Sequence, residues 1–149
     1  MPKPRSLVPA QLPVAQEVLS LAGEPHLVGS RCTECSLVMV PSLEICIRCG
    51  SASQDRIDLP RTGVLWTWTT QEFMPPRPPY GADVTRETFT PFLVGYVEFE
   101  NLGRLETQLV DVDADSIRIG TVMELTVIPF SADADGNQRM TFAFRPKTD

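Results

Sequence analysis

Residues 32–49 read Cys32-Thr-Glu-Cys35, ten intervening residues, and Cys46-Ile-Arg-Cys49. Each C-x-x-C segment predicts a tight turn that presents two thiolates, and two such turns facing each other supply the corners of a tetrahedral metal site. The chain has 4 cysteines, so all of them fall in these two equally spaced pairs. We therefore interpret the stretch as a metal site whose ligands are Cys32, Cys35, Cys46 and Cys49.

The metal predicted for this site is structural Zn²⁺. Four sulfur ligands complete the tetrahedral shell and leave no open position for water or substrate. The short loop between the two turns is typical of a zinc ribbon, but iron in a rubredoxin-like site has the same geometry and remains an alternative. Two disulfides are a further alternative, which is disfavoured because nothing in the chain is typical of a secreted protein.

Length and composition predict one main core with a small additional module. A chain of 149 residues with 42% hydrophobic content can bury one such core. The first residues, Met1-Pro-Lys-Pro-Arg-Ser6, lack the apolar run of a signal peptide. No stretch approaches the roughly 20 apolar residues of a membrane span. We expect a soluble, cytoplasmic protein that does not enter a membrane.

The charge of the chain argues against a general nucleic-acid binder. The formal net charge is −6, and four thiolates on one Zn²⁺ would add two further negative charges. Binding to phosphates needs clustered Lys and Arg, whereas the two lysines, Lys3 and Lys147, lie at opposite ends and the 11 arginines are scattered. A single-stranded nucleic-acid-binding module stays as the alternative, because zinc ribbons and small barrels often bind nucleic acid.

Three segments are expected along the chain. Residues 1–25 carry a short helix over Gln11–Ala22, whose apolar side docks on its own domain or on another subunit. Residues 26–56 form the zinc ribbon, with a strand at 37–40 between the cysteine turns. Residues 57–149 form a β-domain.

The β-domain is predicted to be a five-stranded antiparallel OB-fold barrel. Period-two alternation marks five strands, at 62–70, 92–100, 104–112, 123–127 and 139–145. In the first of them, Val64, Trp66 and Trp68 are expected to share one face. Gly63 and Gly95 suit the curvature of a barrel, because a missing side chain lets a strand bend.

A proline-rich segment separates the first two of these strands. It begins Phe73-Met-Pro-Pro-Arg77-Pro-Pro-Tyr80-Gly81 and continues to Pro91. Its prolines favour an extended surface segment that cannot pair within a sheet. It is either a stiff connector or an arm that docks on a partner, with Phe73, Met74 and Tyr80 as apolar anchors.

Catalytic motifs are missing from the sequence. It has no phosphate-binding glycine loop, no G-x-S-x-G elbow and no H-E-x-x-H. Glu98 and Glu100 share a strand face and Glu106 lies across the hairpin, an arrangement more typical of a solvated outer face than of a catalytic pair. The only histidine, His26, is expected to pack. We expect no catalysis by this chain alone.

The combined motifs resemble those of a known family. They are Cys46-Ile-Arg-Cys49-Gly50-Ser51, Gly63-Val-Leu-Trp-Thr-Trp68-Thr, the loop ending Pro79-Tyr80, and Pro91-Phe-Leu-Val-Gly95-Tyr-Val. With the ribbon and the predicted helix, they resemble the acyl-CoA-associated OB-fold family with an N-terminal rubredoxin-like zinc ribbon. The chain departs from that family at Ile47, where proline is common, and at Ser36, where glycine is common.

The resemblance implies a non-catalytic accessory subunit of a thiolase-fold enzyme that acts on acyl-CoA. The partner would carry the nucleophile for carbon–carbon bond cleavage or formation, for example in degradation of an aromatic or steroid acyl-CoA. The assembly would be a hetero-oligomer, for example two of each subunit. Coenzyme A would meet this chain through isolated arginines, for which Arg31, Arg48 and Arg77 are the candidates, because Arg can bind phosphate in a bidentate manner. Surface arginines without a specific partner are the simpler alternative.

Overall fold

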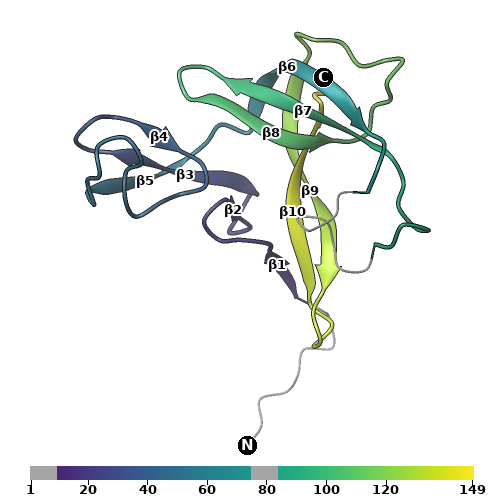
Figure 1. Ribbon diagram of the computed structural model, residues 1–149, viewed down its shortest axis with the longest axis horizontal. Helices are drawn as coiled ribbons and strands as arrows, with labels where there is room; N and C mark the ends of the chain where they lie inside the picture. The colour runs from purple at the N-terminus through teal and green to yellow at the C-terminus, as the bar shows by residue number, and fades with distance from the viewer. Residues whose placement is uncertain (1–9, 75–83) are drawn as a thin grey trace, which may run out of the picture.

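The structure is a computed structural model that describes residues 10–74 and 84–149, and within those ranges it is built of strands and turns (Figure 1). The strands in chain order are β1 (Gln11–Pro13), β2 (Leu19–Ser20), β3 (His26–Cys32), β4 (Val38–Met39), β5 (Gln54–Asp58), β6 (Thr62–Gln71), β7 (Phe92–Phe99), β8 (Gly103–Leu109), β9 (Val122–Ala132) and β10 (Gln138–Pro146). None of the described segments is a helix with the length and apolar character that crossing a membrane requires.

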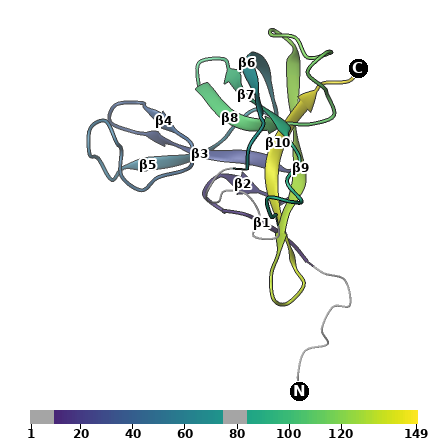
Figure 2. The same ribbon diagram turned by 45° about the vertical axis from the view of Figure 1, so that its right-hand side comes forward.

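Five strands close into a barrel, and β2 to β5 form a smaller sheet beside it. The barrel order is β8-β7-β6-β9-β10, with β10 returning to β8. Figures 1 and 2 show the smaller sheet projecting from one side, with β3 running between the two parts. The smaller sheet carries the cysteine turns, so the ribbon extends outward from the barrel.

The predicted five-stranded barrel is confirmed, but the expectation that it is wholly antiparallel is wrong. Four neighbouring pairs are antiparallel, whereas β10 meets β8 in parallel where Phe144 faces Leu109. The reason is geometric. Strands that alternate in direction around a closed ring must be even in number, so a ring of five must contain a parallel pair.

The N-terminal helix predicted for residues 11–22 is also wrong. Residues 11–13 instead form β1, which pairs in parallel with β10. Pro13 has no N–H and disfavours helical backbone before it, so the remaining stretch is too short for a stable helix. A single turn remains, in which Leu19 N donates to Ala15 O at 3.1 Å. The buried Leu19 belongs to the barrel core, so this segment does dock on its own domain.

The barrel core explains the two strand glycines. Leu65, Val97 and Phe144 are fully buried, and the Phe144 ring meets the Phe99 ring edge-on at 5.9 Å. A Cβ on Gly95 would lie 2.6 Å from the Thr67 carbonyl oxygen. A Cβ on Gly63 would lie 2.5 Å from Val97 Cγ1. Both glycines are therefore required by close packing of strands and not only by curvature.

A β-bulge in β6 changes which residues face outward. The pairing with β7 shifts by one residue between Leu65 and Thr67, which leaves Trp66 as the extra residue. Trp66 therefore points outward and is 45% exposed, whereas Trp68 packs against the core. The prediction that Val64, Trp66 and Trp68 share one face is wrong for Trp68, because strict alternation cannot anticipate a bulge.

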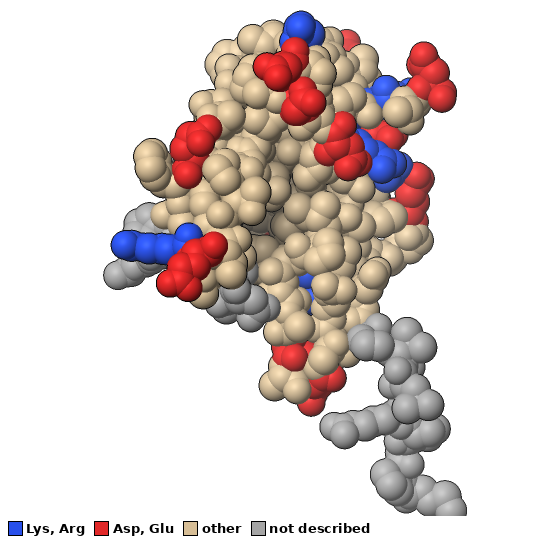
Figure 3. Space-filling view, turned by 90° about the vertical axis from the view of Figure 1, so that its right-hand side faces the viewer, with Lys and Arg blue, Asp and Glu red and all other residues tan. Residues whose placement is uncertain are grey.

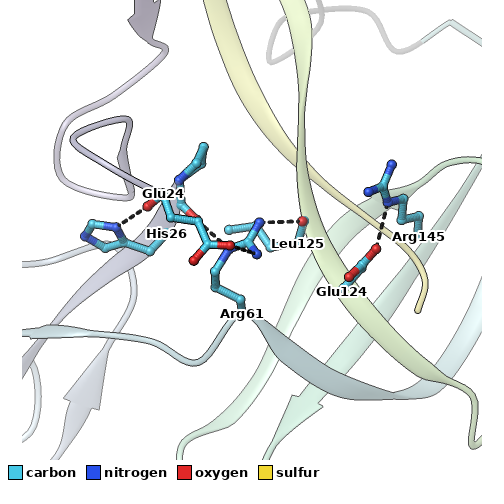
Figure 4. A network of polar contacts seen from close by, with 7 residues as sticks. Glu24, His26, Arg61, Glu124, Leu125 and Arg145 are labelled. Atoms are coloured by element: carbon cyan, nitrogen blue, oxygen red, sulfur yellow. Dashed lines mark hydrogen bonds and ion pairs between the residues drawn. The ribbon is translucent and has the colours of Figure 1, made fainter. Parts of the chain in front are cut away.

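The ribbon and the barrel are joined by a shared core and by one arginine. Leu27 of β3 and Leu59 lie in the same buried cluster as the barrel residues. Arg61 donates from Nε to the Pro25 carbonyl at 2.8 Å and from Nη2 to the Leu125 carbonyl at 3.2 Å, and its Nη1 pairs with Glu24 (Figure 4). The segment before β3 is thus fixed against β9.

Candidate metal centre

The two cysteine turns have the same backbone structure. In the first, Cys32 N donates to Leu37 O at 2.9 Å and Ser36 N donates to Cys32 O at 2.9 Å. In the second, Cys46 N donates to Ser51 O at 2.8 Å and Gly50 N donates to Cys46 O at 2.9 Å. The residue after each turn has positive φ, 62° at Ser36 and 74° at Gly50. Ser36 therefore adopts the left-handed conformation that glycine adopts more readily.

The four sulfur atoms converge on one point. All of them lie within 4.8 Å of one another, with 3.6 Å between Cys32 Sγ and Cys49 Sγ. Cys35 Sγ and Cys46 Sγ are 3.5 Å apart. A tetrahedral site with zinc–sulfur bonds of about 2.3 Å places its sulfurs roughly 3.8 Å apart. The donor set and its spacing therefore fit a four-sulfur metal site, and the cysteines are not paired as disulfides.

Backbone N–H groups near the sulfurs stabilise the thiolate form, and the charges of neighbouring thiolates require a cation between them. The backbone N–H of Cys35 lowers the pKa of the Cys32 thiol to about 6, and that of Cys49 lowers the pKa of Cys46. The backbone N–H of Ser51 favours the Cys49 thiolate, but the adjacent sulfurs, Cys32 foremost, raise the pKa of Cys49 to about 12. Four sulfurs this close cannot all be charged unless a cation lies among them.

Apolar burial within the ribbon is small. Cys32, Met39 and Cys46 form a separate buried cluster, and the described residues packed against it are Cys35 and Leu37. Polar contacts add to it, since Ser30 Oγ accepts from Leu43 N at 3.1 Å and Thr33 bonds Ser53. Modules with so few buried side chains commonly depend on a bound metal for stability.

The structure describes four of the six residues expected to contact acyl-CoA or a partner. Arg31 on β3 and Arg48 in the second cysteine turn are both exposed. Neither forms an ion pair among the described residues. Phe73 is 82% exposed, and Met74 is partly buried. Arg77 and Tyr80 lie outside the described residues.

Two carboxylates of the outer barrel face already have partners. Glu98 Oε2 accepts from Arg104 Nε at 2.6 Å, and Glu106 Oε2 accepts from the Tyr96 hydroxyl at 3.2 Å. His26 lies 3.3 Å from Asp58 through Nε2, and its Nδ1 is 2.9 Å from the Glu24 carbonyl. These contacts are typical of a solvated strand face and of a histidine that supports the start of β3.

A separate groove opens on the barrel side that carries residues 84–92. Its volume is about 460 Å³, and its lining includes Phe89, Phe92 and Phe142, with Glu106 as the only charged group among the described residues. Figure 3 views this side of the molecule, and charged side chains lie mostly at its periphery. Among the described residues, the lining of this groove offers no cation for a phosphate.

Two sets of arginine contacts between residues far apart in the chain were not predicted from the sequence. The Arg104 guanidinium stacks over the Trp66 ring at 3.7 Å. Arg61 donates hydrogen bonds to the carbonyls of Pro25 and Leu125, which are 36 and 64 positions away in the chain. No local pattern signals either contact, because each depends on strand pairing that single-sequence periodicity does not give.

Comparisons with known proteins agree with this architecture. The ChsH2 rubredoxin-like zinc ribbon domain matches residues 20–53, and the ChsH2 C-terminal OB-fold domain matches residues 56–127. A "DUF35 domain-containing scaffold protein" of Methanothermobacter thermautotrophicus is 29% identical over 130 residues, which are 83% of this chain and 88% of that protein.

Two further relatives have names that mention enzymes. A solved structure described as "Ltp2-ChsH2(DUF35) aldolase" matches with 28% identity and a TM-score of 0.59, covering 81% of this chain and 84% of the matched chain. A "Probable enoyl-CoA hydratase alpha subunit" of Thermomonospora curvata is 30% identical over 99 residues. That match spans 66% of this chain but only 28% of the larger protein.

Proposed function

Because the chain belongs to the ChsH2 family, whose zinc ribbon and OB-fold domains it carries in that order, we propose that it is a non-catalytic accessory subunit of a thiolase-family enzyme complex. The partner acts on acyl-CoA substrates by cleaving or forming a carbon–carbon bond, and this chain stabilises the complex and shapes acyl-CoA access. The observation that carries the proposal is the likeness, at 28% identity, to a chain of the Ltp2-ChsH2(DUF35) aldolase.

The metal in this proposal is structural Zn²⁺. Cys32, Cys35, Cys46 and Cys49 would hold it, since their sulfurs already converge within 4.8 Å. With four thiolates the metal has no open position for substrate, so it supplies rigidity to the ribbon and takes no part in the reaction. The protein's contribution is the pair of turns whose backbone N–H groups favour the thiolates.

Coenzyme A and the partner are proposed to meet this chain at different residues. Arg31, Arg48 and Arg77 are proposed to contact the phosphates of an acyl-CoA bound by the partner. Phe73, Met74 and Tyr80 are proposed to help dock the partner. The exposure of Arg31, Arg48 and Phe73 supports these roles.

Replacing Arg48 or Arg77 by alanine is expected to weaken acyl-CoA binding to the complex by at least about tenfold, because each charge-assisted hydrogen bond contributes about 1.5–3 kcal/mol. Titration of the purified complex with an acyl-CoA measures the change, and the complex itself is expected to stay assembled. Arg56→Ala, at an exposed position on β5, serves as the matched control. Unchanged acyl-CoA affinity in Arg48→Ala and Arg77→Ala would show that neither arginine contacts acyl-CoA.

The test of the assembly is co-purification. The chain is co-expressed with a thiolase-fold protein as the candidate partner, with an affinity tag on one of the two. We expect one complex with equal amounts of each subunit, for example two of each, by size-exclusion chromatography with light scattering. Elution of the two proteins as separate species would reject the proposed function.

A further inference from the structure

We propose that the catalytic partner docks on one continuous apolar surface running from the second cysteine turn across the β7–β8 hairpin to the outer barrel face. We call it the ribbon–hairpin surface, and it comprises Leu43, Ile47, Leu105, Trp66, Tyr96, Val64 and Val122. The inference rests on the proposed function and adds to it the location of the interface and the chemistry of the facing surface.

The first part of this surface is a groove between the ribbon and the hairpin. Its volume is about 350 Å³, with Leu43 and Ile47 on the ribbon side and Leu102 and Leu105 on the hairpin side. Figures 1 and 2 both show the β7–β8 turn lying beside β4. Ile47 is 77% exposed, which is unusual for an isoleucine beside an apolar groove. The groove therefore presents apolar side chains from both parts of the protein.

The second part continues from the groove through Arg104. This residue lines the groove, and its guanidinium covers the Trp66 ring at 3.7 Å. Trp66 in turn meets Tyr96 edge-on at 6.2 Å between ring centroids. Both aromatic residues are partly exposed, so Arg104 joins the groove to an aromatic pair on β6 and β7.

Two valines extend the surface to β9. Val64 pairs with Val122 across β6 and β9, and they are 42% and 48% exposed. Val64 lies on β6 ahead of the bulge and faces outward, as Trp66 does. Exposed aromatic and aliphatic side chains grouped in this way are typical of protein–protein interfaces, in which Trp, Tyr and Arg are enriched.

The charges bordering the surface identify the kind of occupant. Glu98 is paired with Arg104, whereas Glu100 and Glu106 have no cationic partner among the described residues. A second copy of this chain would bring these carboxylates toward its own, and nucleic acid would be repelled. The surface fits a protein whose apolar patch is bordered by Lys or Arg, which we assign to the catalytic partner.

Metal binding and docking are linked in this arrangement. Ile47 lies between Cys46 and Cys49, within the turn closed by the Gly50 N to Cys46 O hydrogen bond of 2.9 Å. When both cysteines ligate the metal, the most exposed apolar side chain of the ribbon is fixed at the edge of the groove. A structural metal thereby determines the shape of the interface without touching the substrate.

The test compares two isoleucines of the same loop. Ile47→Glu places a carboxylate in the ribbon–hairpin surface, whereas Ile45→Glu makes the same change at a residue that is 53% exposed and lines a different concavity. Affinity for the thiolase-fold subunit is measured by isothermal titration calorimetry. We expect Ile47→Glu to weaken binding at least about 30-fold, as for an interface hot spot, and Ile45→Glu to change it less than about threefold.

A second variant tests the barrel half of the surface. Trp66→Ala removes the exposed ring under Arg104 and is expected to weaken binding about tenfold or more. Metal content and circular dichroism confirm that each variant is folded.

The outcomes separate failure of the docking surface from failure of the proposed function. Wild-type affinity for Ile47→Glu and Trp66→Ala would overturn the inference but leave the proposed function standing. Failure of the wild-type chain to bind the partner would reject the proposed function itself. Self-association of the wild-type chain that Ile47→Glu abolishes would show that a second copy occupies the surface and would also overturn the inference.

Discussion

Removal of the metal is expected to unfold the ribbon while the barrel stays folded. The ribbon has only three buried side chains in its own cluster, namely Cys32, Met39 and Cys46. Structural zinc contributes about 10–16 kcal/mol to the folding of such modules, far more than this cluster can supply. Chelator treatment or Cys46→Ser is therefore expected to open the segment between β3 and β5 to protease, as measured by limited proteolysis and mass spectrometry.

The matched control for this prediction is Ile45→Ser, which changes an exposed neighbour of Cys46 that is no ligand. It is expected to retain one metal ion per chain by elemental analysis. A colourless protein with zinc would decide against the iron alternative, whose thiolate site absorbs visible light. Full protease resistance after chelation would contradict the structural role of the metal.

Replacing Leu27 by alanine is expected to destabilise the barrel by about 2–5 kcal/mol, although Leu27 precedes the cysteine turns. Leu27 is fully buried and belongs to the barrel core cluster. Both tryptophans, Trp66 and Trp68, lie on β6, so their fluorescence reports unfolding of the barrel. Denaturant unfolding followed by this fluorescence measures the loss.

Val38→Ala provides the control for Leu27→Ala. Val38 lies on β4 of the ribbon and is only partly buried, so its truncation is expected to leave the tryptophan-monitored unfolding nearly unchanged. If Leu27→Ala also had no effect on that transition, β3 would belong to the ribbon alone and the two parts would not share a core.

The sequence predicted the parts of the structure that depend on local patterns. The cysteine turns were predicted because each needs only two residues at fixed spacing. The period-two alternation predicted for residues 92–100 is present in β7, where Leu93, Gly95, Val97 and Phe99 are buried and the residues between them are more exposed. The hairpin that places Glu106 across from the second predicted strand is also present, and Asn101 and Gly103 of its turn both have positive φ.

The errors arose where distant parts of the chain meet. Residues 11–22 have a modest helical pattern, but the first three of them pair instead with the backbone of β10, more than 120 positions away. Trp68 was placed on the same face as Val64 and Trp66, because strict alternation along one strand does not show the bulge at Trp66, which depends on pairing with β7. The parallel contact between Phe144 and Leu109 follows from closure of the barrel, which no single strand reveals.

At the candidate metal centre too, local sequence patterns were predictive and contacts between distant residues were not. The four ligands were predicted from spacing, and their sulfurs converge in the structure. The exposed groove between ribbon and hairpin was not predicted, because Ile47 and Leu105 are brought together only when the ribbon is fixed against the barrel. Arg61 provides part of that fixation through the carbonyls of Pro25 and Leu125.

The central claim is that this chain supports a reaction that another subunit performs. Its most direct test is acyl-CoA turnover measured with this chain alone, with the thiolase-fold subunit alone and with the reconstituted complex. We expect no turnover by this chain alone and the highest turnover by the complex. Turnover of an acyl thioester by this chain in the absence of a partner would contradict the account.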